Sequence, residues 1–215
     1  MNKNLIKELL ILGIGLIPLG YLLSIWTALP ETIPTHWNIH GEADSFSGKT
    51  SAWRIVGLGI LIPLLMKFLP KLDPKKENYA IFQDSYYKLR LLIAVFFSFL
   101  ATAILSVSLS GNSELFIRLL SVGIGLLFAG IGNYLGTVKP NFFVGIRTPW
   151  TLSNENVWKK THQLAGKLWF FGGILIVVVS FFFPPQTAFF VLIITISVVS
   201  LIPIVYSYIW FREAK

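Results

Sequence analysis

The sequence contains no cysteine, and this absence excludes three kinds of site at once. A disulfide framework, a zinc site with thiolate ligands and a cysteine nucleophile all need the sulfur atom that the chain lacks. Charge is also scarce, since Asp, Glu, Lys and Arg make up 13% of the 215 residues, against about 25% in an ordinary globular protein. Apolar residues make up 54% of the chain, which indicates a membrane protein.

Acidic side chains are missing from the middle of the long apolar runs. All ten Asp and Glu residues fall outside these runs or at their margins. A charge at the centre of a bilayer is costly and is usually kept only where it has a function. The sequence therefore gives no support to a proton-coupled pump, which needs a buried carboxylate, or to an intramembrane aspartyl protease, which needs two. The His-Glu-x-x-His pattern of zinc proteases is absent as well.

Six apolar runs each come near the roughly 20 residues that a helix needs to cross about 30 Å of hydrocarbon. They cover residues 9–28, 52–69, 91–110, 115–135, 165–183 and 188–210. The connections at 111–114 and 184–187 are tight turns, which predict antiparallel neighbours. We therefore expect an all-α, polytopic integral membrane helical bundle with six transmembrane helices, forming a single membrane domain over residues 1–215.

The basic residues predict the orientation of the bundle. If the N-terminus is cytoplasmic, the outer side holds only Lys49, Arg54 and Arg118 of the 18 Lys and Arg residues. This bias predicts an N-in/C-in topology, with both termini in the cytoplasm. The net charge of +8 then reflects topology and contact with the lipid bilayer, and no direct binding of nucleic acid is expected. Residues 29–51 form the predicted outer loop, and residues 71–90 and 138–164 the predicted inner loops.

Local signals predict further features of the runs and loops. Asp73 before Pro74 predicts a helix start in the first inner loop, and Ser153 is expected to cap a short helix over residues 154–164. Asn133, the one strongly polar residue well inside a run, is interpreted as a helix–helix hydrogen bond rather than a transport site. Close approach of another helix is predicted by a stripe of small residues in the same run, namely Ser121, Gly125, Ala129, Gly132 and Gly136.

Three residues of the outer loop have the spacing of metal ligands on a helix: His36, His40 and Asp44. Pro34 and Gly41 argue against a helix there, and no fourth ligand is evident. We therefore predict neither a metal nor a cofactor. Instead, His36, Trp37 and Asn38 are expected to make hydrogen bonds that hold the loop on the ends of the spans.

The second inner loop contains the stretch "GIRTPW", which brings an arginine next to a tryptophan. Gly145 allows the backbone to bend closely, so that Arg147 can stack on Trp150, bind a lipid phosphate or hold carbonyl groups at the end of a span. The pattern is compatible with an aromatic belt that has a basic anchor, and with a recognition surface. The residues alone leave both interpretations open.

Taken together, the loops resemble a known family. "IPTHWNIHGEAD" at residues 33–44, "GNYLGTVKPN" at 132–141 and "NFFVGIRTPWTLSNENVWKKTHQLAG" at 141–166 are similar to motifs of the SdpI family of bacterial membrane immunity proteins. The founding member of that family protects its producer cell from a secreted peptide toxin, and it also holds a small DNA-binding repressor at the membrane. The resemblance implies a receptor-like immunity protein with no catalytic step, whose partners are a secreted toxin and a cytoplasmic repressor.

The positions that match the family motifs fall into two sets. The outer set, to which we assign toxin contact, is Pro34, His36, Trp37, Asn38, Gly41 and Asp44. The inner set, to which we assign signalling, is Gly145, Arg147, Thr148, Pro149, Trp150, Trp158, Thr161 and His162. Both assignments are hypotheses that follow from the predicted topology.

Two other classes of function stay open at this stage. A transporter or flippase that expels an amphipathic molecule predicts a polar cavity around Asn133. An enzyme acting at the level of the lipid headgroups would use His36 or His162 as its base. It would need the carboxylate of Asp44 or Glu155 within hydrogen-bonding distance of that histidine.

Overall fold

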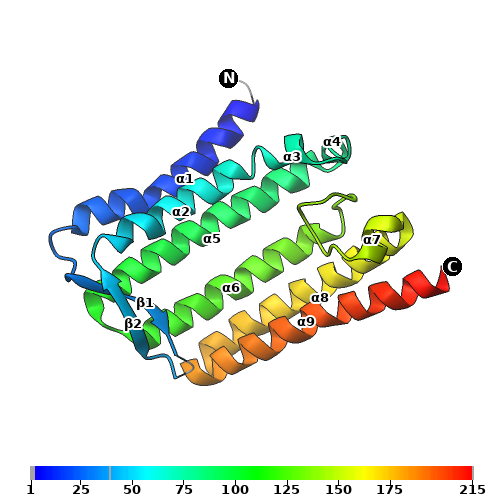
Figure 1. Cartoon of the computed structure of the whole chain (residues 1–215). Coiled ribbons are helices and arrows are strands. Elements are labelled where there is room, and N and C mark those ends of the chain that lie inside the picture. The colour runs from blue at the N-terminus through cyan, green and yellow to red at the C-terminus, as the bar shows by residue number, and fades with distance from the viewer. Residues whose placement is uncertain (1–2, 39, 215) are drawn as a thin grey trace.

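The computed structural model describes residues 3–38 and 40–214. Long helices run side by side along the molecule, and a small hairpin lies across one end of them (Figure 1). The long elements are α1 (Lys3–Ile25), α2 (Ser51–Leu65), α5 (Gln83–Ser110), α6 (Ser113–Leu135), α8 (Glu155–Phe182) and α9 (Pro185–Glu213). The short elements are β1 (Thr32–Trp37), β2 (Ala43–Gly48), α3 (Leu69–Leu72), α4 (Asn78–Ile81) and α7 (Pro149–Ser153). Ile39 of the outer motif and Lys215 of the predicted inner basic residues lie outside the described residues.

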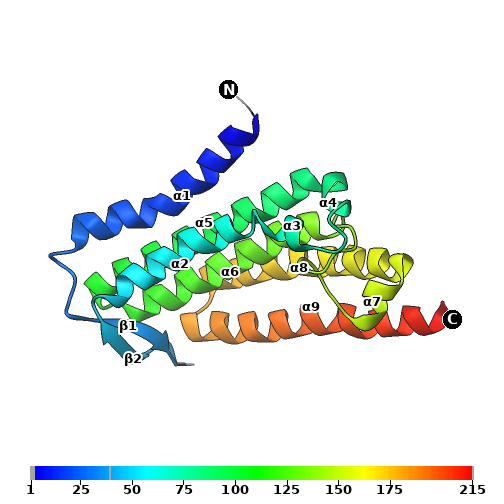
Figure 2. The same ribbon diagram turned by 45° about the horizontal axis from the view of Figure 1, so that its top comes forward.

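The helices pack in two groups of three. In the first group α1, α2 and α5 contact one another, and in the second α6 and α9 both contact α8 and each other. Contacts between α5 and α6 join the groups. Both described chain ends lie at the end of the bundle away from the hairpin (Figures 1 and 2). The molecule therefore has an end that carries the hairpin and an opposite end that carries the termini, α3, α4 and α7.

Five of the long helices are long and apolar enough to cross a membrane. They are α1, α5, α6, α8 and α9, with spans of 22 to 29 residues. The helix α2 has only 15 residues, about 22 Å at 1.5 Å per residue, which is shorter than a hydrocarbon layer of about 30 Å. The expected count of six full-length spans is therefore not confirmed, although α2 runs beside α5 from the hairpin toward α3 (Figure 1).

The early end of α2 has a local cause. Pro70 has no N–H group for the carbonyl of Met66, and its ring would clash with that carbonyl in a continued helix. The hydroxyl of Tyr86 donates to the Met66 carbonyl instead. Arg90 donates from Nε and Nη2 to the carbonyl of Pro63 at 3.3 and 3.2 Å. Two side chains of α5 therefore satisfy carbonyl groups that the end of α2 leaves without a helical partner.

The stripe of small residues on α6 packs against α8, as the sequence predicts. A β-carbon on Gly132 would overlap the backbone of Phe170, and one on Gly173 would overlap the backbone of Gly125 and Ala129. A β-carbon on Gly166 would lie 2.9 Å from the carbonyl oxygen of Gly132. Close backbone approach of this kind is how glycines let helices associate in membranes.

The outer loop contains the one departure from the all-α prediction within the described residues. β1 and β2 form a two-stranded antiparallel sheet in which Thr32 faces Gly48 and Pro34 faces Phe46. Sequence analysis treats this segment as an ordered loop, because its prolines and polar residues give no strong strand signal. Pro34 is compatible with a strand here because a two-stranded sheet leaves one side of each strand without a ladder partner.

Two predicted helix starts are wrong. Ser153 ends α7, and the cap of α8 is Asn154, whose Oδ1 accepts hydrogen bonds from the backbone N–H groups of Asn156 and Val157. α8 then continues without interruption to Phe182. Asp73 begins no helix, because its carboxylate accepts hydrogen bonds from a local turn and from the second inner loop, as described below.

Candidate functional sites at the two ends of the bundle

The hairpin is attached to the bundle through one of its faces. Ile33 is fully buried among residues of α1, α2 and α5. The ring of Trp37 stacks on Phe116 of α6, with centroids 3.7 Å apart and planes 20° from parallel. The side chain of Gln186 at the start of α9 donates to the carbonyl of His40 at 3.4 Å. The hairpin thus contacts both groups of helices.

The turn between the two strands is organised by Asn38. Its Oδ1 accepts hydrogen bonds from the backbone N–H groups of His40 and Glu42 at 2.9 and 3.1 Å. Its Nδ2 donates to the carboxylate of Glu42 at 3.1 Å. Gly41 has a φ of +82°, a conformation that glycine adopts with little strain.

His36 and Asp44 form the exposed part of the outer set. Nδ1 of His36 lies 2.5 Å from Oδ1 of Asp44, and the two side chains are 67% and 41% exposed. No group of three His, Cys, Asp or Glu residues that could hold a metal ion occurs in the part of the chain that the structure describes. His40 therefore does not complete a site with this pair.

The outer set thus divides into buried and exposed members. Pro34 and Gly41 are buried, and Trp37 and Asn38 are partly buried. The expectation that His36 and Asn38 bond to the ends of the spans is wrong: their hydrogen bonds lie within the hairpin and its turn. Trp37 departs from the expectation, since its Nε1 is buried without a partner among the described residues. His36 and Asp44 are therefore the members of the outer set that a ligand at this end of the bundle can reach.

At the other end, a loop over residues 137–148 folds onto the segment that follows α3. Asn141 is fully buried. Its Oδ1 accepts from the backbone N–H groups of Phe143 and Val144 at 2.9 and 2.6 Å, and its Nδ2 donates to the carbonyls of Lys139 and Val144. One amide side chain therefore holds the shape of the loop.

Asp73 and Tyr79 connect this loop to the first inner segment. The Asp73 carboxylate, which is 3% exposed, accepts from the backbone N–H groups of Lys75 and Phe142, each at 2.8 Å. The Tyr79 hydroxyl lies 3.0 Å from Asp73 and 3.2 Å from Oδ1 of Asn141. Burial, followed by the hydrogen bond to Asp73, raises the pKa of Tyr79. The hydroxyl therefore stays protonated and shares its hydrogen between the two acceptors.

His162 fixes the "GIRTPW" stretch from below. Its Nε2 accepts the backbone N–H of Ile146 at 2.9 Å, so Nδ1 carries the proton and donates to the carbonyl of Trp158 at 2.8 Å. Gly145 has a φ of +109°, and a β-carbon there would overlap Nε2. His162 is fully buried, with both nitrogens engaged, and it cannot serve as the base of an enzyme in this arrangement.

Most other members of the inner set are also structural. Thr148 and Thr151 form a capping box at the start of α7, in which Pro149 occupies the first turn. The indole N–H of Trp150 donates to the hydroxyl of Ser207, and that of Trp158 donates to the carbonyl of Val138 at 2.8 Å. The hydroxyl of Thr161 is buried without a partner among the described residues.

Arg147 is the one charged member of the inner set, and it is exposed. The structure shows neither stacking on Trp150 nor a contact with span-end carbonyl groups, since Nη1 of Arg147 donates to the backbone oxygen of Phe142. Trp150 turns away from Arg147 toward α9, where it contacts Tyr208. The carbonyl that Arg147 contacts belongs to its own loop rather than to the end of a span.

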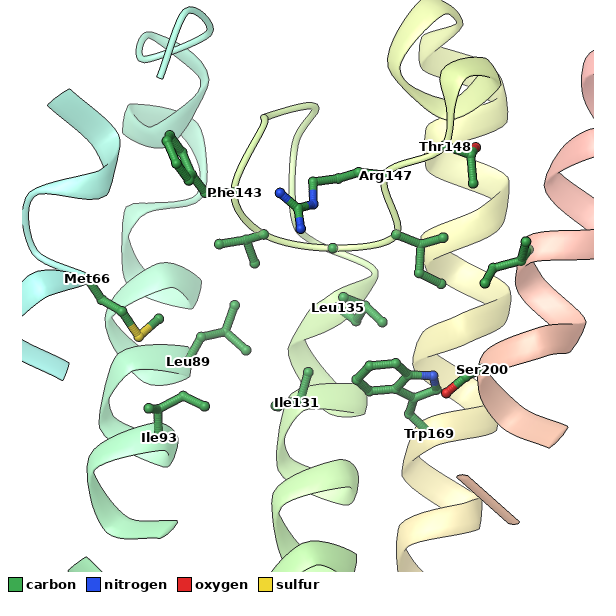
Figure 3. A pocket seen from close by; sticks show the side chains of 14 residues that line it. Met66, Leu89, Ile93, Ile131, Leu135, Phe143, Arg147, Thr148, Trp169 and Ser200 are labelled. Carbon is green, nitrogen blue, oxygen red and sulfur yellow. The ribbon is translucent and has the colours of Figure 1, made fainter. Parts of the chain in front are cut away.

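A cavity of about 450 Å³ lies beneath Arg147, between α5, α6, α8 and α9. Figure 3 shows the guanidinium group on the loop above Leu135, with Leu89 and Ile93 on one side and Trp169 on the other. A second cavity of similar volume is lined by Asn133, Gln163 and Lys167 together with small and aromatic residues of α6 and α8. Asn133 is exposed and makes no hydrogen bond within the described chain, so the expected helix–helix hydrogen bond is absent.

The sequence does not indicate the part that three residues have in the inner site: Asp73, Tyr79 and Asn141. Asn141 is part of the quoted motif, but an asparagine in a loop usually indicates only a turn. Asp73 before a proline indicates a helix cap equally well. Nothing in the sequence shows that residues 73 and 142 come together, because their contact depends on how α5 and α6 pack.

Comparisons with known proteins agree with this architecture. The model described as "SdpI/YfhL protein family" matches residues 137–207, which begin with the inner loop and end in α9. The model described as "Domain of unknown function (DUF1648)" matches residues 13–60, which include the hairpin. "Immunity protein SdpI" from Bacillus subtilis (strain 168) is 29% identical over 170 residues, covering 78% of this chain and 76% of that protein. No solved structure matches the chain.

Proposed function

We infer that the chain is a member of the SdpI family, and from this premise we propose that it is a bacterial membrane immunity protein that protects its cell from a secreted antimicrobial peptide toxin. The observation that carries the proposal is the similarity to a protein named as an immunity protein, which extends over 78% of the chain. The five membrane-length helices are in keeping with a protein that acts in the membrane.

We propose that the hairpin faces outward and that both termini are cytoplasmic. Within residues 29–51, Glu31, Glu42 and Asp44 stand against one basic residue, Lys49, which lies 3.9 Å from Glu31 and over the ring of Trp26. This surplus of acidic groups favours a cationic peptide as the toxin. The exposed pair of His36 and Asp44 is the part of the outer set that a toxin can reach.

The orientation can be tested cleanly because the chain contains no cysteine. A cysteine introduced at exposed Ser45 of β2 is expected to react with a membrane-impermeant maleimide in intact cells. A cysteine at exposed Lys159 of α8 should react only after the membrane is opened. The reverse pattern would contradict the proposed topology, and it would also move the toxin contact to the other end of the bundle.

Immunity itself is tested by expressing the chain in a sensitive bacterium and challenging the cells with secreted peptide toxins. We expect wild-type protein to raise survival, and Asp44→Asn to reduce that protection at equal membrane levels. His40→Ala is the matched control, because the His40 side chain is exposed in the same turn and only the backbone groups of this residue are hydrogen-bonded. Protection against none of the tested toxins, with expression confirmed, would refute the immunity proposal.

We further propose that the end with the termini binds a small cytoplasmic repressor. Buried Trp158, Thr161 and His162 would act by holding the surface in shape, and exposed Arg147 with the neighbouring lysines of α8 would make the contact. Co-fractionation of a candidate repressor with membranes is expected for wild-type protein and is expected to fall for Lys159→Glu. Equal recovery with both proteins would count against this contact surface.

Transport is a second candidate, because the cavity around Asn133 is the polar cavity that it predicts. If transport removes the toxin, protection should require membrane energisation and should fall in Asn133→Leu. The enzyme alternative retains only the pair of His36 and Asp44, which are within hydrogen-bonding distance. Turnover that is abolished by His36→Ala would support it.

A further inference from the structure

The cavity beneath the 143–148 segment has apolar walls and a cation at one end. Its volume of about 450 Å³ falls in the range of about 300–1,000 Å³ that is usual for small-molecule sites. α5 contributes Leu89 and Ile93, α6 contributes Ile131 and Leu135, and Arg147 lies on the covering loop (Figure 3). A ligand that fills the cavity must therefore be largely apolar.

Polar groups on the walls offer little to a small hydrophilic ligand. The indole N–H of Trp169 is already donated to the carbonyl of Val199 at 3.2 Å. The hydroxyl of Thr148 is engaged with Thr151. Only the hydroxyl of Ser200 is left without a protein partner among the described lining residues. Polar recognition is thus concentrated at Arg147.

Arg147 has most of its hydrogen-bonding capacity free. A guanidinium group has five N–H donors, and in the described chain Arg147 uses Nη1 alone, toward the carbonyl of Phe142. No acidic side chain forms a salt bridge with it among the described residues, and nearby Asp73 is occupied by Lys75, Tyr79 and Phe142. The planar group matches the geometry of a phosphate.

The loop presents this group on a fixed backbone. Ile146, the residue before Arg147, is held by His162, and Thr148, the residue after it, caps α7. The hydrogen bonds of Asn141 hold the other arm of the loop. A ligand that binds Arg147 therefore does not have to order the backbone, which favours binding.

From these observations we infer that the cavity binds one anionic phospholipid, with its phosphate on the guanidinium of Arg147 and an acyl chain between α5 and α9. Both helices are long enough to cross the bilayer, so a lipid can enter sideways from the membrane. Arg147 lies beyond the apolar walls, at the end of the spans, where headgroup phosphates are found. The inference rests on the cavity, on the free donors of Arg147 and on the membrane location, and it does not depend on the proposed immunity function.

The test is native mass spectrometry of the purified full chain, titrated with phosphatidylglycerol and, separately, with phosphatidylcholine. We expect one tightly retained phosphatidylglycerol and at least about tenfold weaker retention by Arg147→Gln, because a charge-assisted pair is lost. Arg147→Lys should be intermediate. Ile93→Trp, which fills the cavity without touching the arginine, should also lose the lipid.

Lys159→Gln is the matched control, because it removes an exposed positive charge of α8 that does not line the cavity. It is expected to retain the lipid like the wild-type chain. The inference would be overturned if the wild-type chain and Arg147→Gln both retained phosphatidylglycerol and phosphatidylcholine to the same extent. Displacement of the lipid by glycerol phosphate would also overturn it, because that result would assign the site to a free phosphate. If Arg147→Gln fails to fold, unchanged retention by Ile93→Trp would be the contradicting result.

Discussion

The backbone N–H of Ile146 donates a 2.9 Å hydrogen bond to Nε2 of His162, and these two residues join the inner loop to α8. The preceding residue, Gly145, passes so close to the imidazole that any side chain would overlap it. The arrangement makes the loop, α7 and α8 one mechanical unit. It also explains why a buried histidine can be retained at this position without a catalytic role.

This contact predicts that Gly145→Ala destabilises the protein. The added methyl group would meet His162, and alanine is strained at a φ of +109°. We expect a loss of about 2–4 kcal/mol of folding free energy, measured as a lower midpoint of thermal unfolding in detergent. Gly57→Ala is the control, because no atom lies within 4 Å of a β-carbon there. Equal stability of the Gly145 variant and the wild-type chain would contradict the described loop geometry.

Gly173→Ala tests the packing of α6 on α8. Its β-carbon would overlap the backbone of Gly125 and Ala129, and backbone cannot move aside as the end of a flexible side chain can. A loss of about 1–3 kcal/mol is expected, with unfolding followed by helix content against temperature. Gly13→Ala on α1, where a β-carbon has open space, should leave the midpoint unchanged.

The ion pair of Glu8 with Arg90 is largely buried, whereas that of Lys7 with Asp84 is solvated. We predict that loss of the first pair lowers the free energy of unfolding more than loss of the second. Arg90 is 5% exposed and donates to both carboxylate oxygens of Glu8, at 2.8 and 3.1 Å. Arg90→Ala is expected to cost about 3 kcal/mol, because it leaves the carbonyl of Pro63 without its donor and leaves the Glu8 carboxylate with Lys67 alone, at 3.4 Å. Lys7→Ala, which breaks the solvated pair with Asp84, should have little effect. Similar losses in both variants would show that burial of Arg90 is not the cause.

Tyr79 predicts a loss of stability at alkaline pH. Its pKa is raised in the folded state by burial and by the Asp73 carboxylate, whereas an unfolded tyrosine titrates near about 10. The stabilising contribution is therefore complete below pH of about 10 and is lost as pH rises above it, because only the unfolded state releases the proton there. Unfolding midpoints between pH 8 and 11 should fall more steeply for the wild-type chain than for Tyr79→Phe. Identical slopes would show that the hydroxyl does not titrate with unfolding.

Several parts of the architecture could be predicted from single residues and their spacing. Long apolar runs predict helices because a bilayer leaves no other partner for backbone N–H and C=O groups. The small-residue stripe on α6 predicts close helix contact because small side chains let the two backbones approach each other. The motif over residues 141–166 can be identified from the sequence because its residues follow one another along the chain.

Contacts between distant segments could not be predicted in this way. The hydroxyl of Tyr86 and the guanidinium of Arg90 reach the carbonyl groups at the end of α2 from another helix, and residues 51–65 alone give no sign of these contacts. The hairpin forms because Ile33 and Trp37 find apolar surfaces on the bundle, which sequence periodicity does not show.

By itself, the sequence determined that this chain is a multi-pass membrane protein with polar connections at both ends, because hydrophobic length and charge placement are local properties. Only the tertiary structure decided which polar residues are structural and which are open to a partner. The physical reason is that burial and hydrogen bonding depend on neighbours far along the chain. The polar atoms of His162 and Asn141 are used in hydrogen bonds within the protein. Arg147, which lies between them in sequence, keeps most of its N–H donors free beside a cavity.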